Sequence, residues 1–160
     1  MKDPLGTYLH DHLAGAGFAI DLLQAMKERQ IEKPDSGFVE PLLARVEEDR
    51  NTLQQLADKI GSGPNVLKEF TAWIGEKASR VKLGAGLAGD FGEFEALEFL
   101  ALGITGKLSL WLALQALAPS DSRLSGMDLE RLIARAEEQY REVEKRRLSL
   151  AVPALVSSKG

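Results

Sequence analysis

The chain has no cysteine and only two histidines, and it shows few of the patterns from which strands are built. Without cysteine there is no disulfide framework, no thiolate metal site and no thiol nucleophile. Runs of β-branched and aromatic residues with two-residue alternation are nearly absent, so a sheet is not expected. Internal repeats and low-complexity segments are absent from the sequence as well. The lack of strand signals favours an all-helical protein.

The chain also lacks an excess of positive charge and a long uncharged segment. Its net charge is −4, and neither half is basic, so the electrostatic footprint of a nucleic-acid-binding protein is missing. The small basic cluster at 145–147 fits the negative end of a helix. The N-terminus shows no secretory signal, and the longest uncharged run in the apolar stretch, 108–118, is too short to cross a bilayer. We expect a cytoplasmic protein with neither nucleic acid nor membrane as a partner.

Apolar residues recur at three- and four-residue steps along nearly the whole chain, which is the period of amphipathic helices. With 160 residues, of which 44% are hydrophobic, the chain can bury one proper core, and we expect a single domain over 1–160. The pattern predicts helices at about 5–30, 38–60, 64–79, 91–117 and 127–151, a connection over 61–90 and a tail over 152–160.

Residues that favour helix ends occur at most of these boundaries. Asp3 is placed to cap the first helix, and Gly61 suits the left-handed position that ends the second. Asp90 is expected to cap the helix that begins at 91, and Ser125 the helix that begins at 127. Pro153 is expected to stop the last helix.

The fourth and fifth predicted helices differ in their apolar pattern. The helix over 91–117 is apolar nearly all round, which is typical of a helix buried on every side. The helix over 127–151 has one apolar face. The residues expected to face inward there are Leu129, Leu132, Ala136, Tyr140, Val143 and Leu150.

The spacing of the helices indicates their connectivity. Short loops produce antiparallel pairs, whereas the connection over 61–90 is long enough to span the length of a helical bundle. We therefore expect an all-α, ferritin-like antiparallel four-helix bundle with one long crossover that carries a short fifth helix. An up-down-up-down bundle is the alternative, and it would need only a short loop at this position.

Two segments carry a resemblance to a known group. The stretch Tyr-Leu-His-Asp-His-Leu-Ala-Gly at 8–15, and Gly-Ile-Thr-Gly-Lys at 103–107 with Trp111, resemble small bacterial proteins of the ferritin-like superfamily. The resemblance covers nearly the whole chain. Membership of the superfamily implies a di-metal carboxylate centre, whereas the narrower group implies no particular activity.

The ligand set of such a centre is incomplete in this sequence. A ferritin-like di-metal site takes a Glu from each of two helices and a Glu-x-x-His motif from each of the other two. His10 and His12 both lie in the first helix, and Glu47 and Glu48 are followed three residues later by residues other than histidine. We therefore expect no di-iron centre, no bound metal and no cofactor. A site of carboxylates alone, for a hard cation, is the alternative.

Three polar residues interrupt apolar surfaces and are the candidate ligand-binding residues. His12 lies on the apolar stripe of the first helix, Asp49 on that of the second, and Glu98 within the most apolar helix. They would form a polar core pocket together with Lys107. The alternative, which we favour, is a hydrogen-bonded core histidine and internal ion pairs, for example between Glu98 and Arg146 or Arg147.

Counting along the first hairpin also places His12 nearer to Ala57 than to Asp49, so the candidate residues need not converge. The aromatic residues Phe70, Trp73, Phe94 and Trp111 would floor a ligand pocket or, as we expect, fill core volume.

The glycine-rich segment 84–89 matches G-x-G-x-x-G but lacks the strand context of a dinucleotide site, so we expect a loop. No catalytic triad can be recognised in the sequence.

The leading functional hypothesis is a non-enzymatic scaffold or interaction protein without a di-metal centre. The alternative is a metal- or small-molecule-binding protein or enzyme that uses a polar pocket in the core. A homodimer through the fourth helix or the tail is the expected assembly, and the sequence indicates no particular protein partner or substrate.

Overall fold

The structure, a computed structural model, describes residues 3–30, 37–61 and 89–156, and these residues contain helices and no strand. The all-helical prediction is therefore confirmed for this part of the chain. The expected helix at 64–79, Phe70 and Trp73 within it, and nearly all of the glycine-rich segment lie outside the described residues. The helices are α1 (Pro4–Gln30), α2 (Val39–Ile60), α4 (Gly89–Leu117), α5 (Leu129–Ser149) and α6 (Ala151–Leu155), with short 3₁₀ turns at Ala118–Ser120 and Ser122–Leu124.

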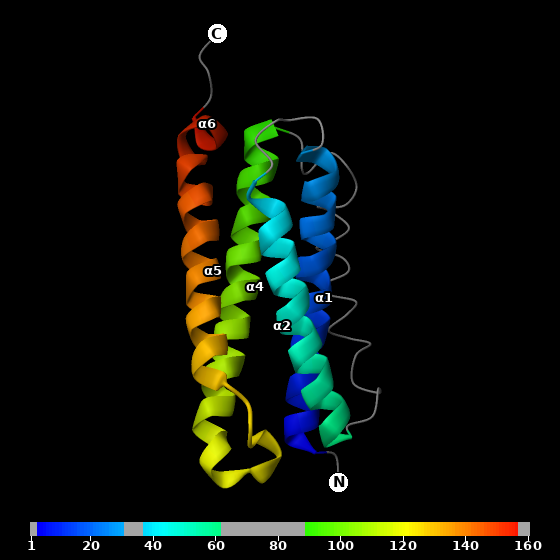
Figure 1. Ribbon diagram of the computed structural model, residues 1–160. Helices are drawn as coiled ribbons and strands as arrows, with labels where there is room; N and C mark the ends of the chain where they lie inside the picture. The colour runs from blue at the N-terminus through cyan, green and yellow to red at the C-terminus, as the bar shows by residue number, and fades with distance from the viewer. Residues whose placement is uncertain (1–2, 31–36, 62–88, 157–160) are drawn as a thin grey trace.

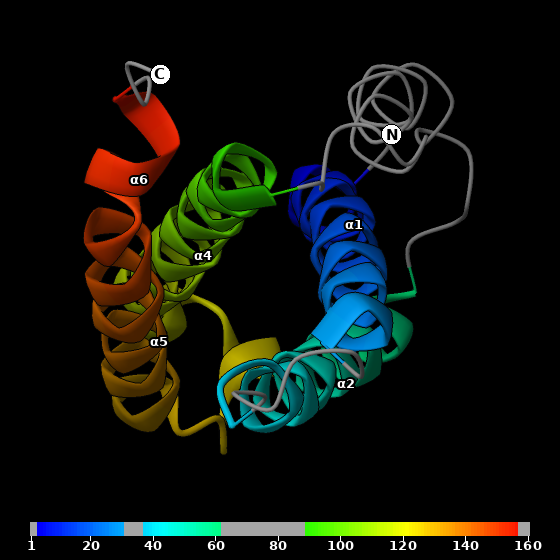
Figure 2. The ribbon, with the colours of Figure 1, turned by 90° about the horizontal axis from the view of Figure 1, so that it is seen from above.

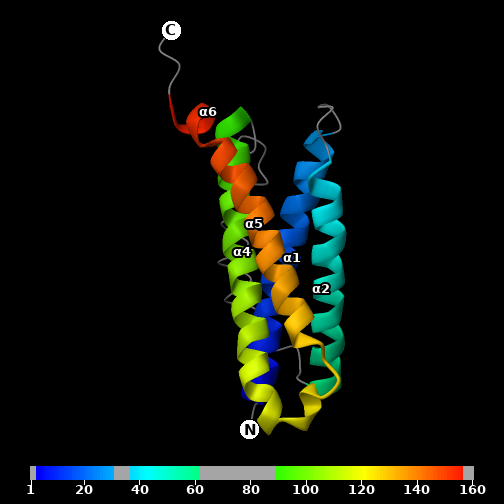
Figure 3. The same cartoon turned by 60° about the vertical axis from the view of Figure 1, so that its left-hand side comes forward.

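Four long helices lie side by side (Figure 1). α1 packs against α2, α4 packs against α5, and α1 also contacts α4. Figure 1 shows that α2 and α4 run in the same direction, so that α2 ends at the opposite end of the molecule from the start of α4. Seen from above in Figure 2, the helices surround a common interior, and Figure 3 shows the α4–α5 pair beside the α1–α2 pair.

The buried apolar residues form two clusters, one toward each end of the helices. One contains Val46 of α2, Ile104 of α4 and Val143 of α5. The other contains Leu53, Leu110 and Ala136 of the same three helices, in the same order. Polar side chains of these three helices, Asp49, Lys107 and Gln139, lie between residues of the two clusters.

The helix ends follow local hydrogen-bonding chemistry. The Asp3 side chain caps α1, since Oδ1 accepts from the Leu5 backbone N–H at 3.1 Å, and Gly61 ends α2 with a left-handed φ of 72°. Two predicted caps are wrong. Asp128 caps α5 by accepting from the backbone of Arg131 at 3.1 Å, because Ser125 is the C-cap of the preceding 3₁₀ turn. α4 begins at Gly89, so Asp90 lies inside its first turn. Part of the expected tail is helical, as α6.

The prediction that the fourth helix is buried all round is wrong. The exposed fractions of Phe91, Leu102 and Leu112 are 52%, 63% and 47%, because α1 and α5 cover only part of the α4 surface among the described residues. Over the residues that the structure describes, the segment Gly89–Ser120 is long and apolar enough to span a membrane. A core helix of a water-soluble protein meets the same criterion.

Candidate functional site

A polar network lies in the interior between α2, α4 and α5. The Lys107 ammonium on α4 donates to Asp49 Oδ2 on α2 at 2.6 Å and to the Gln139 side-chain oxygen on α5. The Gln139 amide nitrogen in turn donates to the same Asp49 oxygen at 3.0 Å. Asp49 and Gln139 are buried, and only 15% of the Lys107 side chain is exposed. One carboxylate therefore links three helices at the boundary between the two apolar clusters.

Arg135 of α5 completes this network on its outer side. Its Nε lies 3.2 Å from Asp49 Oδ1, but without hydrogen-bond geometry, so both atoms are buried without a hydrogen-bond partner among the described residues. Its Nη2 donates to the Arg45 carbonyl at 2.9 Å and to Glu48 Oε2 at 2.8 Å. The Asp49 carboxylate thus lies between an ammonium and a guanidinium, and this pairing offsets the cost of burying it.

Burial and neighbouring charges set the protonation of these cations. Loss of hydration lowers the pKa of Lys107, the Arg135 and Arg45 charges lower it further, and Asp49 opposes the shift. The hydrogen bond to Glu48 raises the pKa of Arg135, and the bidentate bond to Glu142 raises that of Arg45. The two arginines therefore stay charged, while Lys107 is the cation whose proton is most weakened by its surroundings.

A pocket of about 400 Å³ opens beside this network, between α1, α2 and α4. Asp49 and Lys107 form part of its wall, which is otherwise mainly apolar. We call it the α1–α2–α4 pocket. The apolar residues that line it are Ala16, Phe18, Ala19, Leu23, Leu42, Val46, Leu53, Phe99, Leu100, Leu102, Ile104, Leu110 and Trp111, together with the glycines Gly15, Gly103 and Gly106.

The structure places His12 in the wall of the same pocket. Its ring lies edge-on to Tyr8, with 4.7 Å between the ring centroids. Burial lowers its pKa, and the nearby Asp11 charge offsets part of that shift, so the imidazole favours its neutral form. Counting along the hairpin suggested that His12 and Asp49 would lie apart, but both side chains line one pocket together with Lys107.

Glu98, the third candidate ligand-binding residue, does not belong to this group, and the ion pair that we favoured for it is confirmed. Its side chain is 55% exposed and pairs with Arg147 of α5 at 3.4 Å. The apolar sequence around it gave the false signal, because α4 keeps one face open to solvent. The ion pair is the alternative that the sequence had offered for this residue.

Gln139 is the member of the network that sequence reasoning missed. The apolar stripe of α5 was expected to contain Tyr140, yet Tyr140 is 38% exposed and Gln139 is fully buried in its place. The spacing of Ala136, Gln139 and Val143, at three and four residues, carries the signal, since these three positions share one helix face. Apolarity alone selected the neighbouring aromatic residue.

Trp111 fills core volume, as the sequence predicted, and it also borders the pocket. The residue is 1% exposed and belongs to the cluster that contains Leu53 and Leu110. Its indole N–H has no hydrogen-bond partner among the residues that the structure describes. Phe94, the other described aromatic candidate, is buried under Arg147 in a cation–π contact and is not part of the pocket wall.

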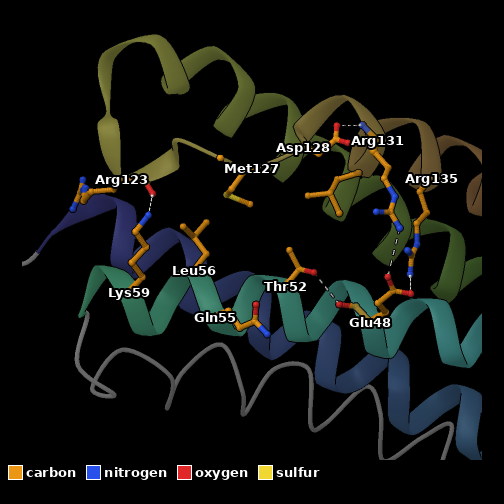
Figure 4. A pocket seen from close by; sticks show the side chains of 12 residues that line it. Glu48, Thr52, Gln55, Leu56, Lys59, Arg123, Met127, Asp128, Arg131 and Arg135 are labelled. Atoms are coloured by element: carbon orange, nitrogen blue, oxygen red, sulfur yellow. Dashed lines mark hydrogen bonds and ion pairs between the residues drawn. The ribbon is translucent and has the colours of Figure 1, made fainter.

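A second pocket, of about 340 Å³, lies between α2 and α5 (Figure 4). Its charged side chains are partnered with each other or with the backbone. Glu48 accepts from Arg135 and lies 3.8 Å from Arg131, and the Lys59 ammonium donates to the Arg123 carbonyl at 2.9 Å. We interpret it as a solvated groove between two helices that is bridged by ion pairs.

The donor set in the interior does not fit a di-metal centre. The buried carboxylate between the helices, Asp49, already holds the Lys107 ammonium and the Gln139 amide, and a second cation is excluded by the positive charge of Arg135 beside it. Elsewhere in the described segments, His, Asp and Glu side chains form no group of three or more that could hold a metal ion.

Comparisons of the chain with protein-family models, with curated proteins and with solved structures find no match. The site is therefore interpreted from its own geometry and chemistry.

Proposed function

We propose that this protein binds a small, uncharged and largely apolar molecule in the α1–α2–α4 pocket. The observation that carries this proposal is the pocket itself, which has about 400 Å³ of space and mainly apolar walls, with Asp11, His12, Asp49, Arg50 and Lys107 as its polar side chains. Pockets of this size, with few polar groups among apolar ones, are the usual form of small-molecule sites. The volume corresponds to roughly thirteen waters at about 30 Å³ each.

The charges around the pocket favour a ligand without net charge. Its ionic side chains are Asp11, Asp49, Arg50 and Lys107, two of each sign, and Asp49 and Lys107 are bonded to each other. Because the two signs balance, an ion entering the pocket would lose its hydration without meeting a net opposite charge, which is costly. An uncharged molecule avoids that cost.

The hydrogen-bonding groups favour a ligand that carries an acceptor. The Lys107 ammonium has three N–H groups, and its two described acceptors are Asp49 and Gln139. A carbonyl oxygen would accept from the remaining N–H group of Lys107, so we propose an apolar carbonyl compound as the ligand class.

Ligand binding in this pocket can be tested with a fluorescent probe and two matched glycine variants. Prodan, a neutral naphthalene ketone whose emission shifts to the blue in an apolar site, is the probe. We expect saturable binding to the unaltered protein and at least about ten-fold weaker binding to Gly15→Leu, because the leucine occupies pocket volume. Both Gly15 and Gly17 have open space where a Cβ would lie, and Gly17 is not part of this pocket. Gly17→Leu is therefore the control, and equal binding to both variants would contradict the proposal.

For the fold, we propose a ferritin-like antiparallel four-helix bundle with one long crossover. The support is the parallel direction of α2 and α4 together with the antiparallel pairs α1–α2 and α4–α5 (Figure 1). The proposed bundle has no di-metal centre, because the Lys107 ammonium occupies the position beside the interior carboxylate of Asp49. The cytoplasmic location and the absence of nucleic-acid and membrane partners stay predictions from the sequence.

A second candidate function is that of an interaction protein, with a second copy of the chain as partner. It is favoured by apolar side chains at the C-terminal end, where Leu148, Val152, Leu155 and Val156 are all more than half exposed. Sedimentation equilibrium tests it. We expect a concentration-dependent dimer that Val152→Asp weakens, whereas a monomer at all concentrations would exclude it.

A further inference from the structure

We propose that Lys107 captures an apolar aldehyde covalently, as a Schiff base, inside the α1–α2–α4 pocket. This inference rests on the proposed function, because it assigns a bond to the ligand class named there. Lys107 is the lysine among the residues that line the pocket, and 85% of its side chain is shielded from solvent. An apolar aldehyde in the pocket would therefore meet this amine in surroundings from which water is largely excluded.

The surroundings of Lys107 make its ammonium easier to deprotonate than that of an exposed lysine, and the reaction needs the free amine. Desolvation and the charges of Arg135 and Arg45 lower its pKa, while Asp49 acts in the opposite direction. Lysines that are desolvated, or that lie next to another cation, are the ones that form Schiff bases readily. The geometry contributes the remaining requirement, a base in contact with the amine, since Asp49 Oδ2 lies 2.6 Å from Nζ.

The reaction can be written with these groups alone. The ammonium passes one proton to Asp49 Oδ2, and the freed lone pair forms a bond to the carbonyl carbon while the π electrons move to oxygen. Protons from the attacking nitrogen and from Asp49 then convert that oxygen to water, which leaves as the C=N bond forms. The ammonium and the aldehyde thus give one protonated imine and one water, with no oxidant or reductant and no change in charge.

The same network would stabilise the product. The protonated imine keeps one positive charge, and Asp49 remains beside it as the counter-ion. Gln139 holds the carboxylate in place through its amide N–H at 3.0 Å, and before the reaction its own oxygen accepts from the lysine ammonium. The arrangement is preorganised, because all three side chains are fixed on separate packed helices.

The experiment traps the imine in the full-length protein. Naphthaldehyde, which lacks a site for conjugate addition, is added with sodium cyanoborohydride, and the product is examined by intact mass and by peptide mapping. We expect one naphthylmethyl group per chain, located on Lys107, with labelling at least about ten-fold faster than at exposed Lys145. Unfolding in urea should remove this preference.

Two arginine variants sharpen the result. Lys107→Arg keeps the positive charge but forms no imine under these conditions, so we expect it to lose the label while it still binds prodan. Lys59→Arg, at an exposed lysine outside the pocket, should keep the label on Lys107. If Lys107→Arg fails to fold, the peptide map of the unaltered protein still decides the question.

The two proposals fail in different ways. Prodan binding with Lys107 unlabelled, or with the label spread over exposed lysines, would overturn the covalent inference and leave ligand binding intact. Absence of both prodan binding and labelling would overturn both.

Discussion

Replacing Asp49 with alanine should lower the free energy of unfolding by about 3–5 kcal/mol, because it leaves a buried cation without its counter-ion. The Asp49 side chain is 3% exposed and that of Lys107 15%, and the two charges are 2.6 Å apart. At an effective dielectric constant of about 20, the gross attraction at that distance is about 6 kcal/mol, of which desolvation removes a part. After the substitution, Lys107 keeps the Gln139 oxygen as its described acceptor, and Arg135 faces it as a second cation.

The reverse change should cost less. In Lys107→Met, the Asp49 carboxylate keeps the Gln139 amide donor at 3.0 Å and the Arg135 guanidinium at 3.2 Å. The carboxylate therefore remains paired, and we expect a loss of about 1.5–3 kcal/mol, which is the range for a hydrogen bond to a charged group.

Urea unfolding followed by far-ultraviolet circular dichroism measures both losses. Asp58→Ala is the matched control, since Asp58 is an exposed aspartate on the same helix and its loss should fall within about 0.5 kcal/mol of zero. A loss below about 1 kcal/mol for Asp49→Ala, or a larger loss for Lys107→Met than for Asp49→Ala, would refute the reasoning on a buried, charge-paired network.

Three further predictions concern other parts of the molecule. Burial holds the pKa of His12 in the folded protein below 6.5, so the unfolded chain takes up a proton first as the pH falls. The free energy of unfolding should therefore decrease as the pH drops through 6.5. In His12→Asn the urea midpoint should depend less on pH over this interval. Gly61→Ala should cost about 1 kcal/mol, since φ is 72° there although a Cβ has free space; a thermal melt as high as that of the unaltered protein would contradict it. Arg45→Met removes a partly exposed bidentate ion pair with Glu142. It should lower the free energy of unfolding by at most about 1 kcal/mol, and by less at high salt. A loss that does not change with salt would count against an ionic origin.

The helical character could be predicted from the sequence because it depends on local spacing. Apolar residues at three- and four-residue steps identified the four long helices α1, α2, α4 and α5, and Gly61 marked the end of α2 through its backbone freedom. Helix starts were less predictable. Several residues near the start of α5 are able to cap that helix. Ser125 is the C-cap of the preceding 3₁₀ turn, so the cap of α5 is Asp128.

The candidate site was predictable only in part, because it depends on which helices meet. Asp49 could be identified from its own helix, since it interrupts an apolar stripe. Glu98 gave the same signal in α4 but lies on the side of that helix where Arg147 and solvent are found. Gln139 is recognised only once α5 is rotated to place its amide next to Asp49 and Lys107. The rotation of each helix about its own axis is set by contacts with the neighbouring helices. The apolar stripe of one helix does not define those contacts.

The most direct test of ligand binding in the α1–α2–α4 pocket is the Trp111 indole N–H signal in a nuclear magnetic resonance titration of isotope-labelled protein with prodan. Trp73→Phe assigns the signal, since the chain has two tryptophans. We predict that the Trp111 signal shifts to a plateau at the same prodan concentration as the fluorescence change, and that in Gly15→Leu both changes need at least about ten-fold more prodan. Saturable fluorescence with an unmoved Trp111 signal would show that prodan binds elsewhere and would contradict the proposed site.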